Sequence, residues 1–349
     1  MWISCIVVGL LASCASAFRT ASDVALAFSK FKLDNGRVYA THDEEVARFA
    51  VFADNVAKAQ ALSAVGDAEF GVTRFSDLRA EEFKEMYLTY TPSADRALNV
   101  VVTPDSDQGF PDHCDYRGTN NITKVKNQNA CGSCWAFSVT EAYESQCARA
   151  GGDNAKAPVL STEQIVDCDT IDLGCDGGDP VSAYKYLKKA GGMTTAKIYP
   201  DTSSASGNAG RCRKFPKPAN KITGFNYTTK PCNDDEHCND QNEHKLALNV
   251  ATTGPPSVCV NAEIWSGYVG GILTSKQCGG NGMSDLDHCV QVVGYNLKTH
   301  GTDGKHKKGY WIVRNSWGTD WGQDGFLYVE YGDNACGIAN EATIPIVSD

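Results

Sequence analysis

Apolar residues in the first part of this chain recur every three or four positions, which is the spacing of one face of a helix. Ser22 can cap a first helix that ends near Asn35-Gly36. Thr41 and Glu44 form a capping-box pattern at the start of a second helix. We therefore expect two amphipathic helices, whose apolar positions are Val24, Leu26, Phe28, Phe31, Phe49, Phe52 and Val56.

The pattern changes from helical periods to short strand-like runs further along the chain. Helices are expected at Cys134–Ala150, Ser161–Cys168 and Pro180–Ala190, and strands at Cys289–Tyr295, Tyr310–Val313 and Phe326–Glu330. Gly151-Gly152 ends the first of these helices, and Ser161 caps the second with Gln164 at the capping-box position. Helices followed by strands predict an α+β fold, in which a mainly helical lobe packs against an antiparallel sheet or barrel-like lobe. We expect a cleft between the two lobes.

Two segments are expected to be removed from the chain. An apolar run from Ile3 to Ala12 precedes Ala15-Ser16-Ala17, which has the small-x-small form of a signal-peptidase site. Residues 1–17 are therefore predicted to be a secretory signal, and the run is too short to span a membrane as a helix. Residues 88–108 are polar, contain two prolines and show no periodicity, which predicts an exposed linker that is cut on activation.

Cysteines divide the rest of the chain into two units. Residues 18–109 contain none, whereas cysteines run from Cys114 to Cys336. Of the fifteen cysteines, Cys5 and Cys14 leave with the signal, and thirteen remain. One catalytic thiol would leave twelve, and an even number in a secreted protein predicts a disulfide framework. We expect one unit at residues 18–109, cut between about 90 and 110, and a globular unit at residues 110–349.

Charge and sequons limit the partners and the compartment. The formal net charge is −10 and no basic run occurs, which argues against nucleic acid and membrane as partners. Sequons at Asn121 and Asn226 are compatible with glycosylation on the secretory route. We expect a monomer that enters this route, and the sequence leaves open whether it works in a lysosome or vacuole or outside the cell.

A cysteine at a helix start is the strongest chemical signal in the sequence. Residues 131–135 read CGSCW and place Cys134 in the first helical turn, where backbone N–H groups and the helix dipole stabilise a thiolate. Gln128 can donate a hydrogen bond to an oxyanion. His288 enters an apolar strand and can act as the base, while Asn315 follows another strand and can fix the ring tautomer. The set predicts nucleophilic catalysis by cysteine.

The ordered combination of Gln128, CGSCW, DHCVQVVGY around His288 and NSWG from Asn315 resembles the papain/cathepsin-type cysteine endopeptidases. The resemblance implies the papain fold and hydrolysis of peptide bonds through an acyl-enzyme, without metal or cofactor. It also implies that Trp317 shields the His–Asn hydrogen bond from water, and that Gly177 and Gly178 bind the backbone of an extended substrate. The disulfides implied are Cys131–Cys175, Cys168–Cys212 and Cys278–Cys336.

Four other cysteines are left without a partner by this resemblance: Cys114, Cys147, Cys259 and Cys289. Cys147 lies on the predicted nucleophile helix, where a buried thiol is the simplest interpretation. Cys232 and Cys238 flank a short polar loop and could pair with each other. The sequence therefore predicts three disulfides by resemblance and a fourth from spacing.

The N-terminal unit resembles the inhibitory pro-region of cathepsin-L-like zymogens. Glu44, Arg48, Phe52 and Asn55 follow the first four positions of the E-R-F-N-I-N pattern, and residues 71–77, GVTRFSD, follow G-x-N-x-F-x-D with Thr73 in place of asparagine. This implies that the pro-region inhibits its own enzyme, and that cystatin-like inhibitors are partners besides peptide and protein substrates. We expect a latent zymogen that is activated in mild acid as carboxylates are protonated, and Glu44 and Arg48 stand at ion-pair spacing on one helix.

The pocket for the P2 side chain of the substrate (the S2 subsite) is also implied by the resemblance. Its expected residues are Asp179, Pro180, Cys259, Leu286, Cys289 and Glu341. Glu341 would stand at the pocket floor and Asp179 near the mouth, so the pocket should accept basic as well as apolar side chains. In the alternative interpretation both acids face water, and the pocket binds only leucine or phenylalanine.

Two functions of other classes compete with the peptidase hypothesis. A lone cysteine or histidine is more often structural than catalytic, and a structural zinc module would also be rich in both. Against zinc, the CxxC of Cys131 and Cys134 has no second CxxC or HxxxH to complete a site. The chain could also be an inactive homologue that binds or stores a partner, but Gln128, Cys134, His288 and Asn315 are all present.

Overall fold

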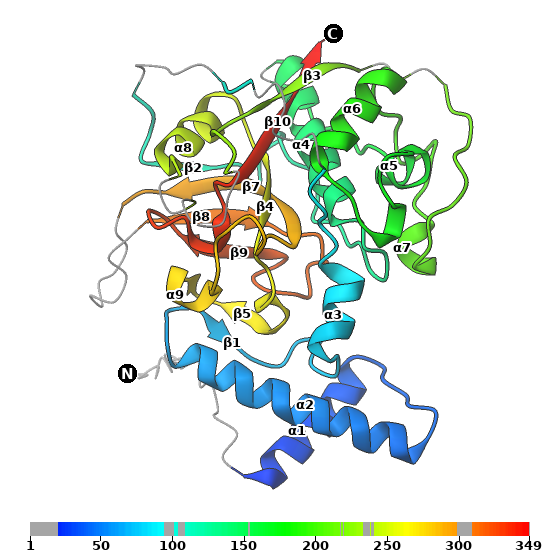
Figure 1. The fold of residues 1–349 in the computed structure, drawn as a ribbon, viewed down its shortest axis with the longest axis vertical. Helices are drawn as coiled ribbons and strands as arrows, with labels where there is room; N and C mark the ends of the chain where they lie inside the picture. The colour runs from blue at the N-terminus through cyan, green and yellow to red at the C-terminus, as the bar shows by residue number, and fades with distance from the viewer. Residues whose placement is uncertain are drawn as a thin grey trace, which may run out of the picture.

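The computed structural model of the protein describes residues 20–348 except 94–100, 104–108, 153, 217, 219, 233–237, 239–240 and 299–308. The predicted signal at residues 1–17 and much of the predicted cleavage segment lie outside the described residues. Figure 1 shows an N-terminal helical unit, in blue, beside a body made of a helical lobe, in green, and a sheet lobe, in yellow to red. This is the α+β architecture that the order of helices and strands predicted.

The N-terminal unit is formed by α1 (Ala21–Asp34), α2 (His42–Ser63) and α3 (Ala80–Tyr87), with a short strand β1 (Glu69–Phe70). The predicted cap of α1 was wrong, because Thr20 rather than Ser22 caps it. The Thr20 hydroxyl accepts from the Asp23 N–H, and the Asp23 carboxylate accepts from the Thr20 N–H. Phe28, Phe31, Phe52 and Val56 form the small core of this unit.

The helical lobe is built around α4 (Cys134–Ala150), which is buried along most of its length. Around it lie α5 (Thr162–Cys168), α6 (Pro180–Ala190) and α7 (Ser203–Ser206). Ser161 caps α5 as expected, but the Gln164 side chain does not complete a capping box. Its amide instead donates to the Gly192 carbonyl and accepts from the Thr194 N–H.

The sheet lobe has the strand order β3-β10-β4-β7-β8-β9-β6, with β2 paired to β7. All neighbours are antiparallel except β6 and β9. Its strands are β2 (His113–Asp115), β3 (Lys221–Tyr227), β4 (Ser257–Val260), β6 (Ile272–Leu273), β7 (His288–Asn296), β8 (Tyr310–Arg314), β9 (Phe326–Glu330) and β10 (Glu341–Ser348). Strand β5 (Tyr268–Gly270) and helices α8 (Glu243–Thr252) and α9 (Ser275–Cys278) complete it.

Five disulfides join described cysteines. Cys131–Cys175, Cys168–Cys212, Cys278–Cys336 and Cys232–Cys238 were expected, and Cys259–Cys289 was not. The last pair lies directly across the neighbouring strands β4 and β7. Among the described residues the free thiols are Cys114, Cys134 and Cys147, and Cys147 is partly exposed rather than buried.

The N-terminal unit docks on the sheet lobe through backbone and side-chain contacts. Strand β1 pairs with β5, and the Thr73 hydroxyl donates to the Ser266 carbonyl at 2.6 Å. Thr73 thus makes a direct bond across the interface at the position where the resemblance has asparagine. Arg74 forms an ion pair with Asp320, and three aromatic rings, Phe75, Phe83 and Tyr87, pack against Trp317.

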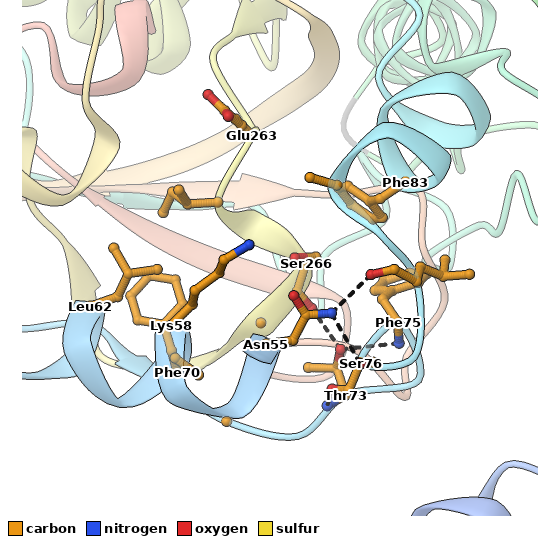
Figure 2. Close-up of a pocket in the computed structure, with 16 residues that line it drawn as sticks. Asn55, Lys58, Leu62, Phe70, Thr73, Phe75, Ser76, Phe83, Glu263 and Ser266 are labelled. Atoms are coloured by element: carbon orange, nitrogen blue, oxygen red, sulfur yellow. Dashed lines mark hydrogen bonds between the residues drawn. The ribbon is translucent and has the colours of Figure 1, made fainter. Parts of the chain in front are cut away.

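The same interface contains a partly open pocket of about 240 Å³ between α2, residues 70–83 and residues 263–267. Figure 2 shows Lys58 and Glu263 among its lining residues, and Asn55 pointing at the loop that carries Ser76. The Asn55 amide donates to the Ser76 and Leu78 carbonyls. The expected pairing of Glu44 with Arg48 was wrong: Arg48 pairs with Glu82, while Glu44 accepts from the Ala40 N–H. These contacts hold residues 76–82 against α2.

Candidate active site

Cys134 is the first residue of α4 and is fully buried. Its Sγ lies 3.8 Å from the Thr89 hydroxyl of the segment that follows α3. Burial raises the pKa of the Cys134 thiol, although the backbone N–H groups of Cys289 and Trp135 favour the thiolate. The segment that carries Thr89 covers the Cys134 sulfur, and this burial favours the protonated thiol over the thiolate.

His288 and Asn315 meet where β7 begins and β8 ends. His288 Nε2 lies 2.8 Å from Asn315 Oδ1, which also accepts from the Ser316 N–H at 2.8 Å. A backbone N–H can only donate, so this second bond identifies the Asn315 atom as the oxygen. Nε2 must then carry the proton, which leaves the Nδ1 lone pair of a neutral ring free to accept a proton.

Burial lowers the pKa of His288 to about 4, against the influence of the Asn315 oxygen and the Tyr87 carbonyl, which both favour the charged ring. The Trp317 ring lies 4.9 Å from the imidazole and the Trp265 ring 6.1 Å from it, centroid to centroid. Both tryptophans are fully buried. Both rings thus lie beside the imidazole that Asn315 holds.

Gln128 is fixed in place by the turn that follows Asn315. The Ser316 hydroxyl donates to Gln128 Oε1 at 2.7 Å, and the Gln128 N–H donates to the Ser316 carbonyl. Gln128 Nε2 donates to the Cys131 carbonyl at 3.1 Å, three residues before the sulfur-bearing residue. The structure thus brings a side-chain amide, a thiol and an imidazole–amide pair together from three separate segments, residues 128–134, the start of β7 and the end of β8.

The segment after α3 runs through the cleft between the lobes. Tyr90 bridges Gly178 in parallel, with the Thr91 N–H donating to the Gly178 carbonyl and the Gly178 N–H to the Thr89 carbonyl. Gly177 has φ 125°, and a Cβ there would lie 2.4 Å from the Thr89 carbonyl oxygen. Only glycine fits at Gly177. The prediction of an exposed linker from residue 88 was wrong at this end, since Leu88 and Tyr90 are buried.

The Tyr90 side chain fills a sulfur-rich pocket. It packs in one buried cluster, which we call the Tyr90 pocket, with Cys232, Cys238, Cys259, Met283, Leu286 and Cys289. Three of the residues expected in the S2 subsite, Cys259, Leu286 and Cys289, are therefore together. Met283 and the Cys232–Cys238 pair were missed, because the sequence offers no signal for which loops reach this place.

The two acids expected in this pocket lie in different places. Glu341 is buried and pairs with Cys259 in the register of β10 and β4. Asp179 lies outside the Tyr90 pocket, because it caps α6: its carboxylate accepts from the Val181 N–H at 2.8 Å and from the Ser93 N–H at 2.5 Å. Pro180 follows it as the first residue of α6. Asp179 and Pro180 thus lie beside the chain three residues beyond Tyr90.

Metal and membrane features are absent from the part of the chain that is described. No group of three histidine, cysteine, aspartate or glutamate side chains among these residues is placed to hold a metal ion. Cys131, half of the CxxC that a zinc module would use, is bonded to Cys175. No described helix combines the length and the apolarity needed to cross a bilayer.

Comparison with known proteins matches both parts of the chain. A family model described as papain family cysteine protease matches residues 110–346, and one described as cathepsin propeptide inhibitor domain matches residues 28–83. The chain is 36% identical over 326 residues to probable cysteine protease RD19D of Arabidopsis thaliana, covering 89% of this chain and 83% of that one. It is 33% identical over 329 residues to cathepsin F of Mus musculus, covering 92% and 64%.

A solved structure resembles the whole described arrangement. The digestive procathepsin L2 proteinase from Tenebrio molitor larval midgut superposes with a TM-score of 0.78 at 30% sequence identity. The similarity covers 92% of this chain and 99% of that one. Both the helical N-terminal unit and the two lobes are therefore shared with a proteinase precursor.

Proposed function

The chain belongs to the papain family of cysteine proteases and is a zymogen with a cathepsin-type pro-region, and we propose that Cys134 is its nucleophile and His288 its general base. The observation that carries this assignment is the 2.8 Å bond from His288 Nε2 to an Asn315 oxygen whose identity the Ser316 N–H fixes. It leaves Nδ1 as the only ring atom able to exchange a proton with a thiol. Labelling by an electrophilic epoxide that is lost in Cys134→Ser tests the assignment.

The reaction follows from these roles. In the open enzyme the Cys134 proton passes to His288, and the thiolate attacks the peptide carbonyl carbon, so that a C–S bond forms and the carbonyl pair moves to oxygen. The Gln128 side chain and the Cys134 backbone N–H donate to this oxyanion. His288 then gives its proton to the leaving nitrogen as the C–N bond breaks. Water, deprotonated by His288, cleaves the thioester and returns the thiolate.

The pro-region inhibits by occupying the cleft. Thr89 covers the Cys134 sulfur and Tyr90 fills the pocket beside it, while the backbones of Thr89 and Thr91 bond to Gly178. Burial under this segment raises the pKa of the thiol and lowers that of the imidazole, so the neutral pair is favoured over thiolate and imidazolium. The segment thus blocks both the substrate and the ion pair.

We propose that acid opens the cleft through His288, and that Asp287 opposes it. The pKa of His288 is about 4 in the closed form and should return to its ordinary value near 6.5 in the open form. The open form therefore binds a proton more readily, and the closed form loses stability as the pH falls below about 6.5. Burial raises the pKa of the Asp287 carboxyl to about 7, although Lys84 of α3 favours its charged form. The part of this shift that opening removes makes acid favour the closed form. The Arg48–Glu82 pair plays no part in mild acid, because the hydrogen bond to Arg48 holds the pKa of Glu82 below its ordinary value.

A substitution at Asp287 separates the two effects. In Asp287→Asn the buried charge that destabilises the closed form at neutral pH is gone. Activation should slow by more than about tenfold at pH 7, and by about fivefold or less at pH 4.5, where the buried carboxyl already holds its proton. The rate of pro-region release is followed by gel, with the matured enzymes matched by titration of the active thiol. Equal slowing at both pH values would contradict the role of the Asp287 charge.

We further propose that the Tyr90 pocket is the S2 subsite and accepts both apolar and basic P2 side chains. Leu286 and the neighbouring sulfurs supply the apolar wall, and buried Glu341 supplies a carboxylate for a guanidinium. Asp179 lies beyond the pocket, at the part of the cleft that Ser93 covers.

Glu341→Ala should therefore lower kcat/KM for reporters with arginine at P2 by about tenfold relative to phenylalanine. The measurement compares reporters with arginine, phenylalanine or leucine at P2, and Glu341→Gln serves as the isosteric control. Negligible cleavage of the arginine reporter by the wild type, or an unchanged arginine-to-phenylalanine ratio in Glu341→Ala, would exclude Glu341 from recognition.

Processing on the secretory route completes the proposal. We expect removal of residues 1–17, glycans at Asn121 and Asn226, and a cut between about residues 90 and 110, which gives a mature monomer. Cystatin-like proteins are the expected inhibitors of this form. The N-terminal sequence of the acid-activated protein and its mass before and after deglycosylation test these points together.

A further inference from the structure

A disulfide stands in the wall of the Tyr90 pocket. Cys259 lies opposite Cys289 on β4 and β7, and Glu341 lies opposite Cys259 on β10. Residues directly opposite on neighbouring strands point to the same face of a sheet, so these three form one row. Cys259 and Cys289 are fully buried and bonded to each other. Their disulfide is therefore one rigid group, and Glu341 follows it in the row.

The buried cluster that contains Tyr90 is rich in sulfur. Of the six other members of its cluster, five carry sulfur: Met283 and the two disulfide pairs Cys232–Cys238 and Cys259–Cys289. Sulfur is polarisable and makes favourable contacts with the edges of aromatic rings, which an aliphatic side chain of equal size does not gain. The pro-region thus places an aromatic side chain in a sulfur-rich cluster.

We propose that the Cys259–Cys289 disulfide determines P2 specificity and selects a flat aromatic side chain. This rests on the proposed function, in which the Tyr90 pocket takes the P2 residue. The disulfide fixes the spacing of β4 and β7 and presents two sulfurs to the ring. Glu341, at the far end of the same row, serves basic side chains whose stems pass along the disulfide. The two recognition elements are therefore separable.

The test is the ratio of kcat/KM for phenylalanine over leucine at P2, with enzyme concentration set by titration of the active thiol. In the Cys259→Ala/Cys289→Ala variant this ratio should fall by about threefold to tenfold, while the arginine-to-leucine ratio changes by less than about twofold. Cys259→Val/Cys289→Ala, which restores volume without sulfur, should show the same fall. Cys168→Ala/Cys212→Ala removes a disulfide outside the Tyr90 pocket and should leave both ratios unchanged.

A comparison in the wild type needs no variant to fold. Phenylalanine and cyclohexylalanine at P2 have similar bulk, but only the first is aromatic. The wild type should cleave the phenylalanine reporter at least about threefold faster. Equal rates there, or an unchanged ratio in either folded double variant, would overturn the disulfide's role. Cleavage of no P2 reporter at all would overturn the proposed function instead.

Discussion

Replacing Cys134 by serine is expected to lower kcat/KM for peptide reporters by at least about 10³-fold, because the hydroxyl is a far poorer nucleophile beside an imidazole arranged for a thiol. Epoxide labelling should vanish as well. The substitution exchanges two similar side chains at a fully buried helix start, so the fold and the docked pro-region should persist. Reporter hydrolysis and labelling of the acid-treated protein measure both effects.

Cys147→Ser is the matched control, since Cys147 is a free thiol on the same helix that is partly exposed. It should retain full activity and labelling. Hydrolysis by Cys134→Ser at more than a tenth of the wild-type rate, or labelling that follows Cys147, would remove Cys134 from the mechanism.

The uncut zymogen should show less than about one hundredth of the activity of the processed enzyme. A tethered segment acts at an effective concentration on the order of millimolar, so even contacts of about 10 µM affinity keep about 99% of clefts closed. The contacts are numerous: Thr89 on the sulfur, Tyr90 in its pocket and three aromatic rings on Trp317.

Tyr90→Ala offers a direct test of latency in the uncut protein. Emptying the pocket should raise basal activity at neutral pH by about tenfold or more, because burial of an aromatic side chain is lost. Leu26→Ala is the control: this side chain is 74% exposed on α1. Full peptidase activity of the uncut wild type at neutral pH would contradict the inhibitory role of the segment.

The local signals in the sequence predicted local structure well. The range Pro180–Ala190 was confirmed at both ends, because Asp179 supplies a capping carboxylate, Pro180 suits the first turn and Gly191 adopts the left-handed conformation that ends a helix. The assignment of α1 missed its cap, since Thr20 and Asp23 bond reciprocally and no single-residue preference shows which of Thr20 and Ser22 does so.

What depends on strand register could not be predicted. Cys259 and Cys289 form a disulfide because the register of β4 and β7 places them opposite each other. The number and spacing of cysteines in the sequence do not reveal which strands pair or in which register. Arg48 stands at helical spacing from Glu44, but its guanidinium reaches Glu82 on another helix. Tyr90 gave no signal at all, because its role depends on a pocket assembled from the distant residues around it.

The turn at Ser316 makes the catalytic side chains interdependent. Its hydroxyl and carbonyl hold Gln128, while its N–H holds the Asn315 oxygen that orients His288. Side chains that share a partner have energies that do not add. The effect of a substitution at Asn315 on activity therefore depends on which residue occupies position 128. Sequence variation at these two sites should be epistatic, and engineering one of them alone will disturb the other.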